Sequence, residues 1–204
     1  MIITEYFMKK AGNTVVSLLT GILMSLSASL YAVEEADPAL DAITNFRQYS
    51  DTFSSAGQPT LEQYQTIADH GFERIVFLAF SNGTNAVADA DQVAKGLGME
   101  YMHVPVDFNN PLPDEFYAFA DSMRRDTDKK TLLHCVVNAR ATAFSFLYRV
   151  IYEDVPMAEA KADMNTVWQP NTVWRDFIFE VLAQNDVSPD CEGCDWTPPP
   201  PRGQ

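Results

Sequence analysis

The sequence predicts an α/β fold with a central, mainly parallel sheet of about four to five strands flanked by helices. Two observations lead to this prediction. Short apolar runs typical of buried strands alternate with segments of helical periodicity between residues 46 and 134, an order that favours a parallel sheet covered on both faces. Beyond residue 140 the pattern is helical only, so we place every strand before that point.

Strands are expected at residues 46–49, 52–57, 74–80, 101–106 and 131–134. The run 74–80 is the first that is long and apolar enough to indicate a fully buried strand. Gln58 and Pro59 close the second run, and a polar turn at residues 81–85 closes the third. A loop with Asn109, Asn110 and two prolines follows the fourth run.

Helices are expected at residues 60–71, 89–97, 114–125, 141–152, 156–164 and 171–184. Thr60 and Gln63 have the spacing of a capping box, and Gly71 suits the C-terminal end of the first helix. In the third helix Phe116 and Phe119 fall on the same side, which indicates a face turned toward a core.

The ends of the chain differ in character from its centre. We expect a signal peptide (residues 1–32), one domain (33–187) and a Cys/Pro-rich tail (188–204). Lys9 and Lys10 precede an apolar run, and small residues lead to a cleavage position after Ala32. The run is shorter than the roughly 20 residues of a membrane-spanning helix, although an uncleaved anchor is the alternative. We therefore expect export to the periplasm or the medium, without stable membrane insertion after cleavage.

The charge of the chain limits its partners. Asp and Glu number 28 against 14 Lys and Arg, which gives a formal net charge of −14. A negative field of this size disfavours nucleic acids and anionic membranes as partners. An anionic substrate must therefore be held by a local positive site.

The cysteines fall into two groups. Cys191 and Cys194 lie close together in the tail, and in an exported protein they are expected to form a local disulfide. A redox-active pair is the alternative. A zinc site needs about four ligands, and no second pair supplies them, so we expect neither a metal nor a cofactor.

The segment around Cys135 and Arg140 is the most informative part of the sequence. A strand leads to the thiol, four residues follow, and the arginine precedes a buried helix. A tight loop entering a helix points backbone N–H groups inward, and the arginine adds a planar two-pronged donor for an oxyanion. These surroundings favour a nucleophilic thiolate. They predict covalent catalysis on a phosphate held by a loop of Val136, Val137, Asn138, Ala139 and Arg140. A structural cysteine beside a helix-capping arginine is the alternative.

Further residues are candidates for supporting roles. Asp107 ends a strand at the edge where parallel-sheet sites form, so we favour it as general acid. Asp114 is the rival, although an acidic residue at a helix start is expected for capping alone. Asn138 suits a position of positive φ. Thr142 is expected either to donate its hydroxyl to the Cys135 sulfur or simply to cap the helix.

Two segments resemble a known family. They are residues 53–60 (Phe-Ser-Ser-Ala-Gly-Gln-Pro-Thr), with the helix that follows to His70-Gly71-Phe72, and residues 134–149 around the Cys135 loop. Together they resemble the cysteine-dependent phosphatase superfamily, and specifically the dual-specificity-phosphatase-like domain found in β-lactamase-hydrolase-like proteins. The resemblance covers roughly residues 46–152. It implies a phosphatase-like fold with Cys135 as nucleophile and Arg140 as phosphate binder, acting on a phosphorylated small molecule or a phosphoprotein.

The loop departs from the commonest pattern. Most protein tyrosine phosphatases have one more residue between the cysteine and the arginine, whereas the smaller family commonly matches this spacing, with Gly in the place of Asn138. A rhodanese-like sulfurtransferase is one alternative, although the chain lacks the Gly-His-Ile-Pro-Gly-Ala-like segment of that fold. A catalytically inactive phosphate- or peptide-binding module is another.

Overall fold

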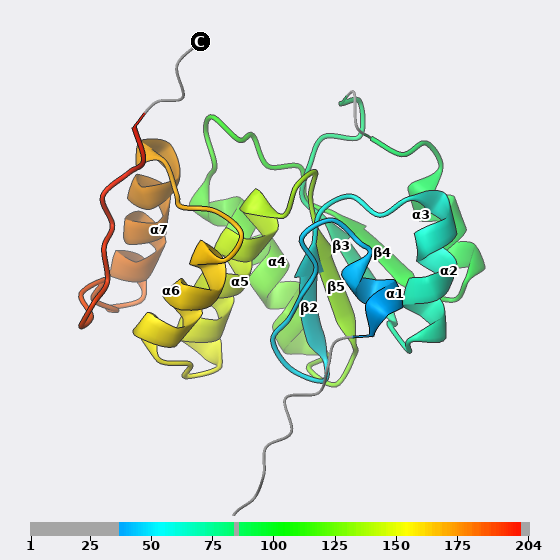
Figure 1. The fold of residues 1–204 in the computed structure, drawn as a ribbon, viewed down its shortest axis with the longest axis horizontal. Helices are drawn as coiled ribbons and strands as arrows, with labels where there is room; N and C mark the ends of the chain where they lie inside the picture. The colour runs from blue at the N-terminus through cyan, green and yellow to red at the C-terminus, as the bar shows by residue number, and fades with distance from the viewer. Residues whose placement is uncertain (1–36, 84–85, 201–204) are drawn as a thin grey trace, which may run out of the picture. The chain divides into compact units, whose positions relative to one another are not determined.

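The computed structural model describes residues 37–83 and 86–200, and the expected signal peptide (1–32) lies outside them. The strands are β1 (Arg47–Gln48), β2 (Phe53–Ala56), β3 (Arg74–Phe77), β4 (Glu100–His103) and β5 (Thr131–His134). They form one sheet in the order β1-β2-β5-β3-β4 (Figure 1). Strands β2, β5, β3 and β4 are parallel, and β1 pairs antiparallel with β2. The predicted α/β class with a mainly parallel sheet is confirmed.

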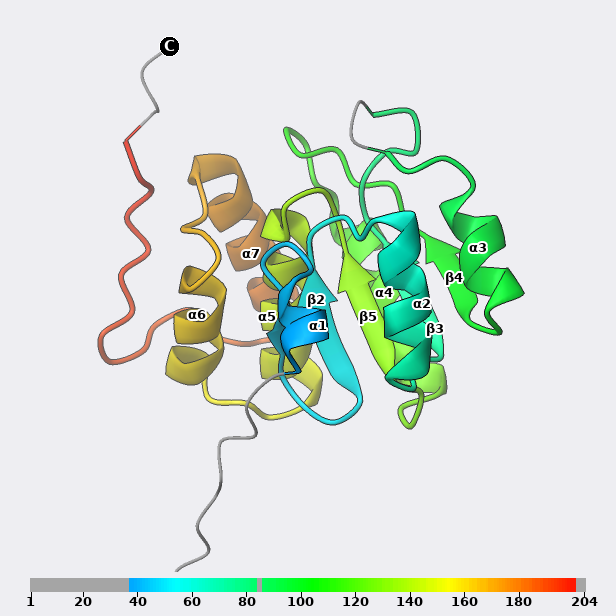
Figure 2. The same cartoon turned by 45° about the vertical axis from the view of Figure 1, so that its right-hand side comes forward.

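Seven helices are described: α1 (Pro38–Asp41), α2 (Leu61–Asp69), α3 (Ala90–Gly96), α4 (Pro113–Arg125), α5 (Ala139–Tyr152), α6 (Met157–Asn165) and α7 (Thr172–Gln184). Helices α4 to α7 lie on one side of the sheet, and α1 to α3 lie on the other (Figures 1 and 2). Each side has its own buried core, because successive side chains of a strand point to opposite faces. Val76 and Leu133 belong to the larger core, whereas Ile75 and Leu132 belong to the smaller one.

Helix α2 begins as the sequence predicts. The Thr60 hydroxyl accepts from the Gln63 backbone N–H at 3.3 Å, and the Gln63 side chain accepts from the Thr60 N–H at 2.9 Å. This reciprocal pair forms the capping box, so it fixes the turn that leads from β2 into α2.

Other element boundaries differ from the prediction. Helix α1 is not predicted; it begins at Pro38 with the Asp37 carboxylate accepting from the Ala39 N–H at 2.8 Å. The predicted run 101–106 is a regular strand only at Glu100–His103. Hydrogen bonds to the β3 side continue beyond it, because the Val104 N–H donates to the Phe77 carbonyl at 2.9 Å and the Val106 N–H to the Leu78 carbonyl at 3.0 Å.

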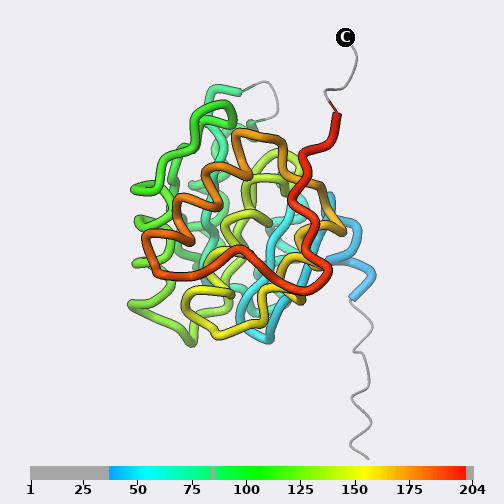
Figure 3. The backbone as a smooth tube through the Cα atoms, turned by 90° about the vertical axis from the view of Figure 1, so that its left-hand side faces the viewer, coloured from blue at the N-terminus to red at the C-terminus, as the bar shows by residue number. Residues whose placement is uncertain are grey.

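The tail is more ordered than its composition indicates. Residues 188–200 contain no helix or strand, but the Trp196 ring packs against Phe146 of α5 and Phe179 of α7, with centroids 5.6 and 5.2 Å apart. Figure 3 shows the tail, in red, running across the last helices. The side chains of Cys191 and Cys194 are joined as a disulfide, with Cα atoms 5.2 Å apart. Residues 188–200 are therefore without regular secondary structure but docked on the helices.

Within the described part of the chain, no helix has the length and apolarity needed to cross a membrane.

Candidate active site

Cys135 follows β5, which lies between β2 and β3 in the sheet. The loops after β3 and β4, the start of α5 and the start of α7 all lie at this carboxyl edge of the sheet (Figure 1). The Cys135 N–H donates to the Ala56 carbonyl of β2 at 3.2 Å. The Cys135 side chain is buried and not part of a disulfide. The thiol is therefore at the position where ligand sites form in parallel sheets.

The loop after Cys135 turns sharply into α5. Asn138 has φ 72°, the left-handed conformation expected from the sequence, and α5 begins at Ala139. The helix thus starts two residues earlier than predicted, and Arg140 belongs to its first turn. The Asn138 N–H faces the Ala56 carbonyl in the bridge between Gly57 and Val137. The backbone N–H groups of Val136, Val137, Ala139 and Arg140 have no hydrogen-bond acceptor within the described residues. Such a set of free donors is the usual anion-binding feature of a helix N-terminus.

The Cys135 loop is held by hydrogen bonds between its own residues Val137 and Asn138 and the distant Asn45. The Asn138 side-chain amide donates to the Asn45 carbonyl at 2.7 Å, and the Asn45 amide donates to the Val137 carbonyl at 3.0 Å. Sequence reasoning did not identify Asn45. These bonds leave the inward N–H groups free, because they use the side chain of Asn138 and a carbonyl.

Gly57 allows a close approach of the segment after β2 to the same loop. A Cβ atom at this residue would lie 2.9 Å from the Val136 carbonyl oxygen and 2.8 Å from Thr44 Cβ. The next residue, Gln58, donates its N–H to the Val136 carbonyl at 3.0 Å. A larger residue than glycine would therefore push this segment off the loop.

The Arg140 guanidinium has no hydrogen bond or ion pair to any described residue, and its Nε atom is buried. Its Cζ atom lies 5.4 Å from the centre of the Phe108 ring. A buried guanidinium nitrogen without an acceptor is costly unless a ligand supplies one. The arginine is thus positioned for an anion that the protein itself does not provide.

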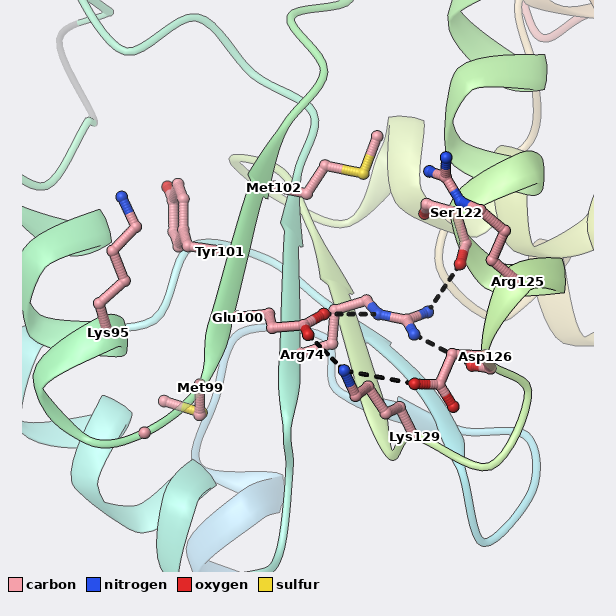
Figure 4. A pocket seen from close by; sticks show the side chains of 11 residues that line it. Arg74, Lys95, Met99, Glu100, Tyr101, Met102, Ser122, Arg125, Asp126 and Lys129 are labelled. Atoms are coloured by element: carbon pink, nitrogen blue, oxygen red, sulfur yellow. Dashed lines mark hydrogen bonds and ion pairs between the residues drawn. The ribbon is translucent and has the colours of Figure 1, made fainter.

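Arg74 shows the opposite arrangement at the other end of the sheet. It lines a surface pocket of about 790 Å³ beside β4 (Figure 4). Its Nη atoms donate to the carbonyls of Ser122 and Asp126 at 3.2 and 3.0 Å, and its Nε lies 3.7 Å from Glu100. Lys129 in the same pocket pairs with Glu100 and Asp126. Arg74 and Lys129 are therefore held by acceptors of the protein itself, which favours a structural role for these two residues.

Asp107 lies in the loop between β4 and α4, next to the residue that covers Arg140. Its carboxylate accepts from the Asn109 N–H at 2.9 Å. The following residue, Phe108, stacks on Arg140 and accepts from the Trp174 Nε1 of α7 through its carbonyl, at 2.9 Å. The loop is thereby held beside the anion-binding turn.

Comparison with known proteins finds solved structures with a similar fold. No protein-family model and no curated protein matches the chain. A DUF442 protein from Shewanella putrefaciens CN-32, provisionally classed as a phosphatase, is 28% identical with a TM-score of 0.67, and the match covers 72% of this chain and 97% of that one. The active form of Tk-PTP is 18% identical (TM-score 0.57, coverage 70% and 96%), and PTPMT1 in complex with PI(5)P is 11% identical (0.60, 69% and 96%).

This chain has the fold of the cysteine-dependent phosphatases. The resemblance seen in the sequence is therefore confirmed at the level of the fold, and these neighbours are related to the dual-specificity phosphatases. Cys135, the free N–H groups and Arg140 occupy the strand–loop–helix segment on which the sequence resemblance rests.

Asp114 and Thr142, the other two residues considered for a role in the site, have different surroundings in the structure. Asp114 is exposed as the second residue of α4 and makes no side-chain hydrogen bond to a described residue. The Thr142 hydroxyl lies 3.2 Å from the Tyr49 hydroxyl, which also bonds Ser55 at 2.8 Å. The structure gives Thr142 no hydrogen bond to Cys135, so its hydroxyl joins α5 to the sheet instead.

Two titratable residues near the site, His134 and Glu115, have shifted pKa values. Burial lowers the pKa of His134 to about 3, so this residue is neutral in the core, where it stacks on Phe77. Burial, with the charge of Asp107, raises the pKa of Glu115 in α4. Sequence reasoning did not single out Glu115. Among residues 37–83 and 86–200 no cluster of His, Cys, Asp and Glu could hold a metal ion.

Proposed function

We propose that this protein is an exported cysteine-dependent phosphatase that hydrolyses a phosphomonoester through a phosphocysteine intermediate. The observation that carries this proposal is the pairing of a free cysteine with an unpartnered arginine across a turn of free backbone N–H groups. The Arg140 guanidinium has a buried Nε atom and no acceptor among the described residues, which favours an external anion as its partner.

The chemistry assigns one role to each group. The Cys135 thiolate attacks phosphorus, the bond to the leaving oxygen breaks, and Asp107 gives its proton to that oxygen. Water then attacks the phosphocysteine, Asp107 takes a proton from this water, and the sulfur–phosphorus bond breaks to release phosphate and the thiolate. Arg140 and the free N–H groups of the turn hold the equatorial oxygens in both steps.

The similar structures support a phosphorylated substrate in general terms. PTPMT1 was solved with PI(5)P, which is a phosphorylated small molecule. For the present chain, a phosphorylated small molecule or a phosphoprotein would suit the same loop, and the free donors of the turn match the oxygens of one phosphate group.

The decisive experiment compares two reactions of the thiol. Wild-type protein should release phosphate from an aryl phosphate and should form no thiocyanate from thiosulfate and cyanide. Cys135→Ser should abolish phosphate release while keeping phosphate or vanadate binding. Thiocyanate production without phosphate release would indicate a sulfurtransferase, and silence in both assays would indicate a binding module. For export, N-terminal sequencing of the mature protein should begin at Val33.

A further inference from the structure

The large apolar side chains that remain exposed in the described residues gather at one edge of the sheet. Each of them has 42–51% of its surface exposed, and they are Leu61, Phe80, Leu112, Val137 and Val173. They lie at the start of α2, after β3, before α4, in the Cys135 loop and at the start of α7. We call this set the apolar rim. Single exposed apolar residues are ordinary, but a gathering on one face marks a binding surface.

Part of the apolar rim adjoins the candidate active site. Leu61 and Val137 line the same pocket of about 550 Å³, together with Val136 of the loop. On the other side of the site, Val173 precedes Trp174, which donates to the Phe108 carbonyl beside Arg140. A ligand whose phosphate lies on the Cys135 loop would therefore extend its organic part over the rim.

Among residues 37–83 and 86–200, the charges at this edge suit one anionic group. Arg140 is unpartnered within the described residues. The Arg175 side chain is bound to Asp176 at 2.7 Å, and the Arg47 guanidinium donates to Thr166. Most other cations lie at the opposite edge, at the start of β3, the end of α4 and the start of β5: Arg74, Arg124, Arg125, Lys129 and Lys130.

We propose that the substrate class of this site is a phosphomonoester with a single phosphate on an apolar, uncharged organic group. The inference rests on the proposed function, because it assigns the substrate of the same site. Arg140 and the turn neutralise one phosphate, and burial of the half-exposed rim by an alkyl or aryl group adds favourable free energy. A polyphosphorylated sugar or an acidic phosphopeptide would place further negative charge against a chain of net charge −14.

Straight-chain alkyl phosphates from butyl to octyl test this directly, because the basicity of their leaving groups is nearly constant. We expect kcat/KM to rise roughly twofold per added methylene, which corresponds to about half of the free energy gained when a methylene is fully buried. Hexane-1,6-diol bisphosphate should be at least about tenfold poorer than hexyl phosphate, because its second phosphate meets no free cation. Leu61→Asn should flatten the dependence on chain length, and the matched variant Leu61→Met should retain it.

Binding to the Cys135→Ser protein, measured by calorimetry with the same alkyl phosphates, separates this inference from the proposed function. If the wild-type protein shows no turnover but the affinity of Cys135→Ser for alkyl phosphates still rises with chain length, the phosphatase proposal fails. The proposed substrates are then ligands of the site. Equal kcat/KM and equal affinity along the series, or preference for the bisphosphate, would overturn the inference and leave the phosphatase proposal intact. If the wild-type protein sediments with phosphatidylcholine vesicles and Leu61→Asn does not, the apolar rim binds a lipid surface. That result would overturn the inference on the substrate class.

Discussion

Asp107 and Asp114 both lie near the site, but their surroundings differ. Asp107 is half-buried, and the next residue stacks on Arg140. Asp114 is exposed in the first turn of α4, where a carboxylate favours the helix dipole. The first setting suits proton transfer to a bound substrate, and the second suits helix stabilisation.

We therefore expect the two Asp→Asn variants to behave differently. Asp107→Asn should lower kcat roughly 100-fold with an alkyl leaving group and less with an aryl one, because only the poorer leaving group needs the proton. Asp114→Asn should cost about 0.5–1 kcal/mol of stability with little change in kcat. Steady-state kinetics and urea unfolding of both variants make the measurement. An exchange of these two behaviours would reverse the assignment of the acid.

His134 predicts a specific dependence of stability on pH. Burial lowers its pKa from 6.5 to about 3. Between these values the unfolded chain binds a proton at His134 and the folded chain does not, so acid favours unfolding. The free energy of unfolding of the wild type should fall below pH 6.5 more steeply than that of His134→Asn, by at most about 1.4 kcal/mol per pH unit. Urea unfolding at several pH values gives both free energies. Equal pH dependence of the free energy of unfolding in wild type and His134→Asn would contradict a buried, neutral His134.

Helix α7 is tied to the loop between β4 and α4 by one buried side chain. Trp174 is fully buried, its Nε1 donates to the Phe108 carbonyl at 2.9 Å, and its ring lies 5.6 Å from the Phe108 ring. Because Asp107 precedes Phe108, the hydrogen bond restricts where the carboxyl group can lie. Trp174 is in this account a positioning residue for the acid.

Trp174→Phe should therefore impair proton donation more than folding. It keeps an aromatic ring but removes the donor, so kcat for an alkyl phosphate should fall about tenfold, and kcat for an aryl phosphate should fall less. Trp196→Phe is a matched control, because it removes an indole N–H that donates to the Pro189 carbonyl in the tail at 3.0 Å. Equal losses on both substrates, or equal losses in both variants, would show that Trp174 acts only through stability.

Across the molecule, charge and apolar surface are separated along the strand direction. Basic residues around the β3 and β4 starts are paired with carboxylates, and the apolar rim with the unpartnered Arg140 lies at the opposite edge. This separation directs an anionic group with an apolar substituent to one end of the sheet, although the whole chain is acidic.

The docked tail contributes to the stability of the helical side. We expect Cys191→Ser with Cys194→Ser to lower the free energy of unfolding by no more than about 2 kcal/mol, because the disulfide closes a very short loop. Urea unfolding of wild type and variant gives the difference. Mass mapping without reduction should find Cys191 linked to Cys194 and a free thiol at Cys135. A link between Cys135 and the tail would instead indicate a redox switch at the site.

The features that could be predicted from the sequence depend on neighbouring residues. The capping box of Thr60 and Gln63 and the left-handed conformation of Asn138 are local, so residue type and spacing were enough. The alternation of strands and helices is also a local pattern, and it correctly indicated the parallel sheet.

The missed features depend on contacts between distant parts of the chain. Asn45 lies 93 residues before Asn138, to which it is bonded, and a lone loop asparagine carries no sign of such a partner. Trp174 is a core residue, but its bond to the Phe108 carbonyl depends on where α7 packs, which the sequence of the helix does not indicate. Thr142 was expected to have a role toward Cys135 or as a helix cap; its side chain instead meets Tyr49 because β1 folds back on β2.

The most direct test of the account is to trap the covalent intermediate. Wild-type protein is mixed with an aryl phosphate, quenched in acid within the first turnover, digested and mapped by mass spectrometry. We expect one phosphoryl group on the Cys135 peptide, absent from Cys135→Ser and longer-lived in Asp107→Asn, which would lack the proposed base that activates water. Phosphate release without a phosphocysteine, or a phosphoryl group on another residue, would contradict it.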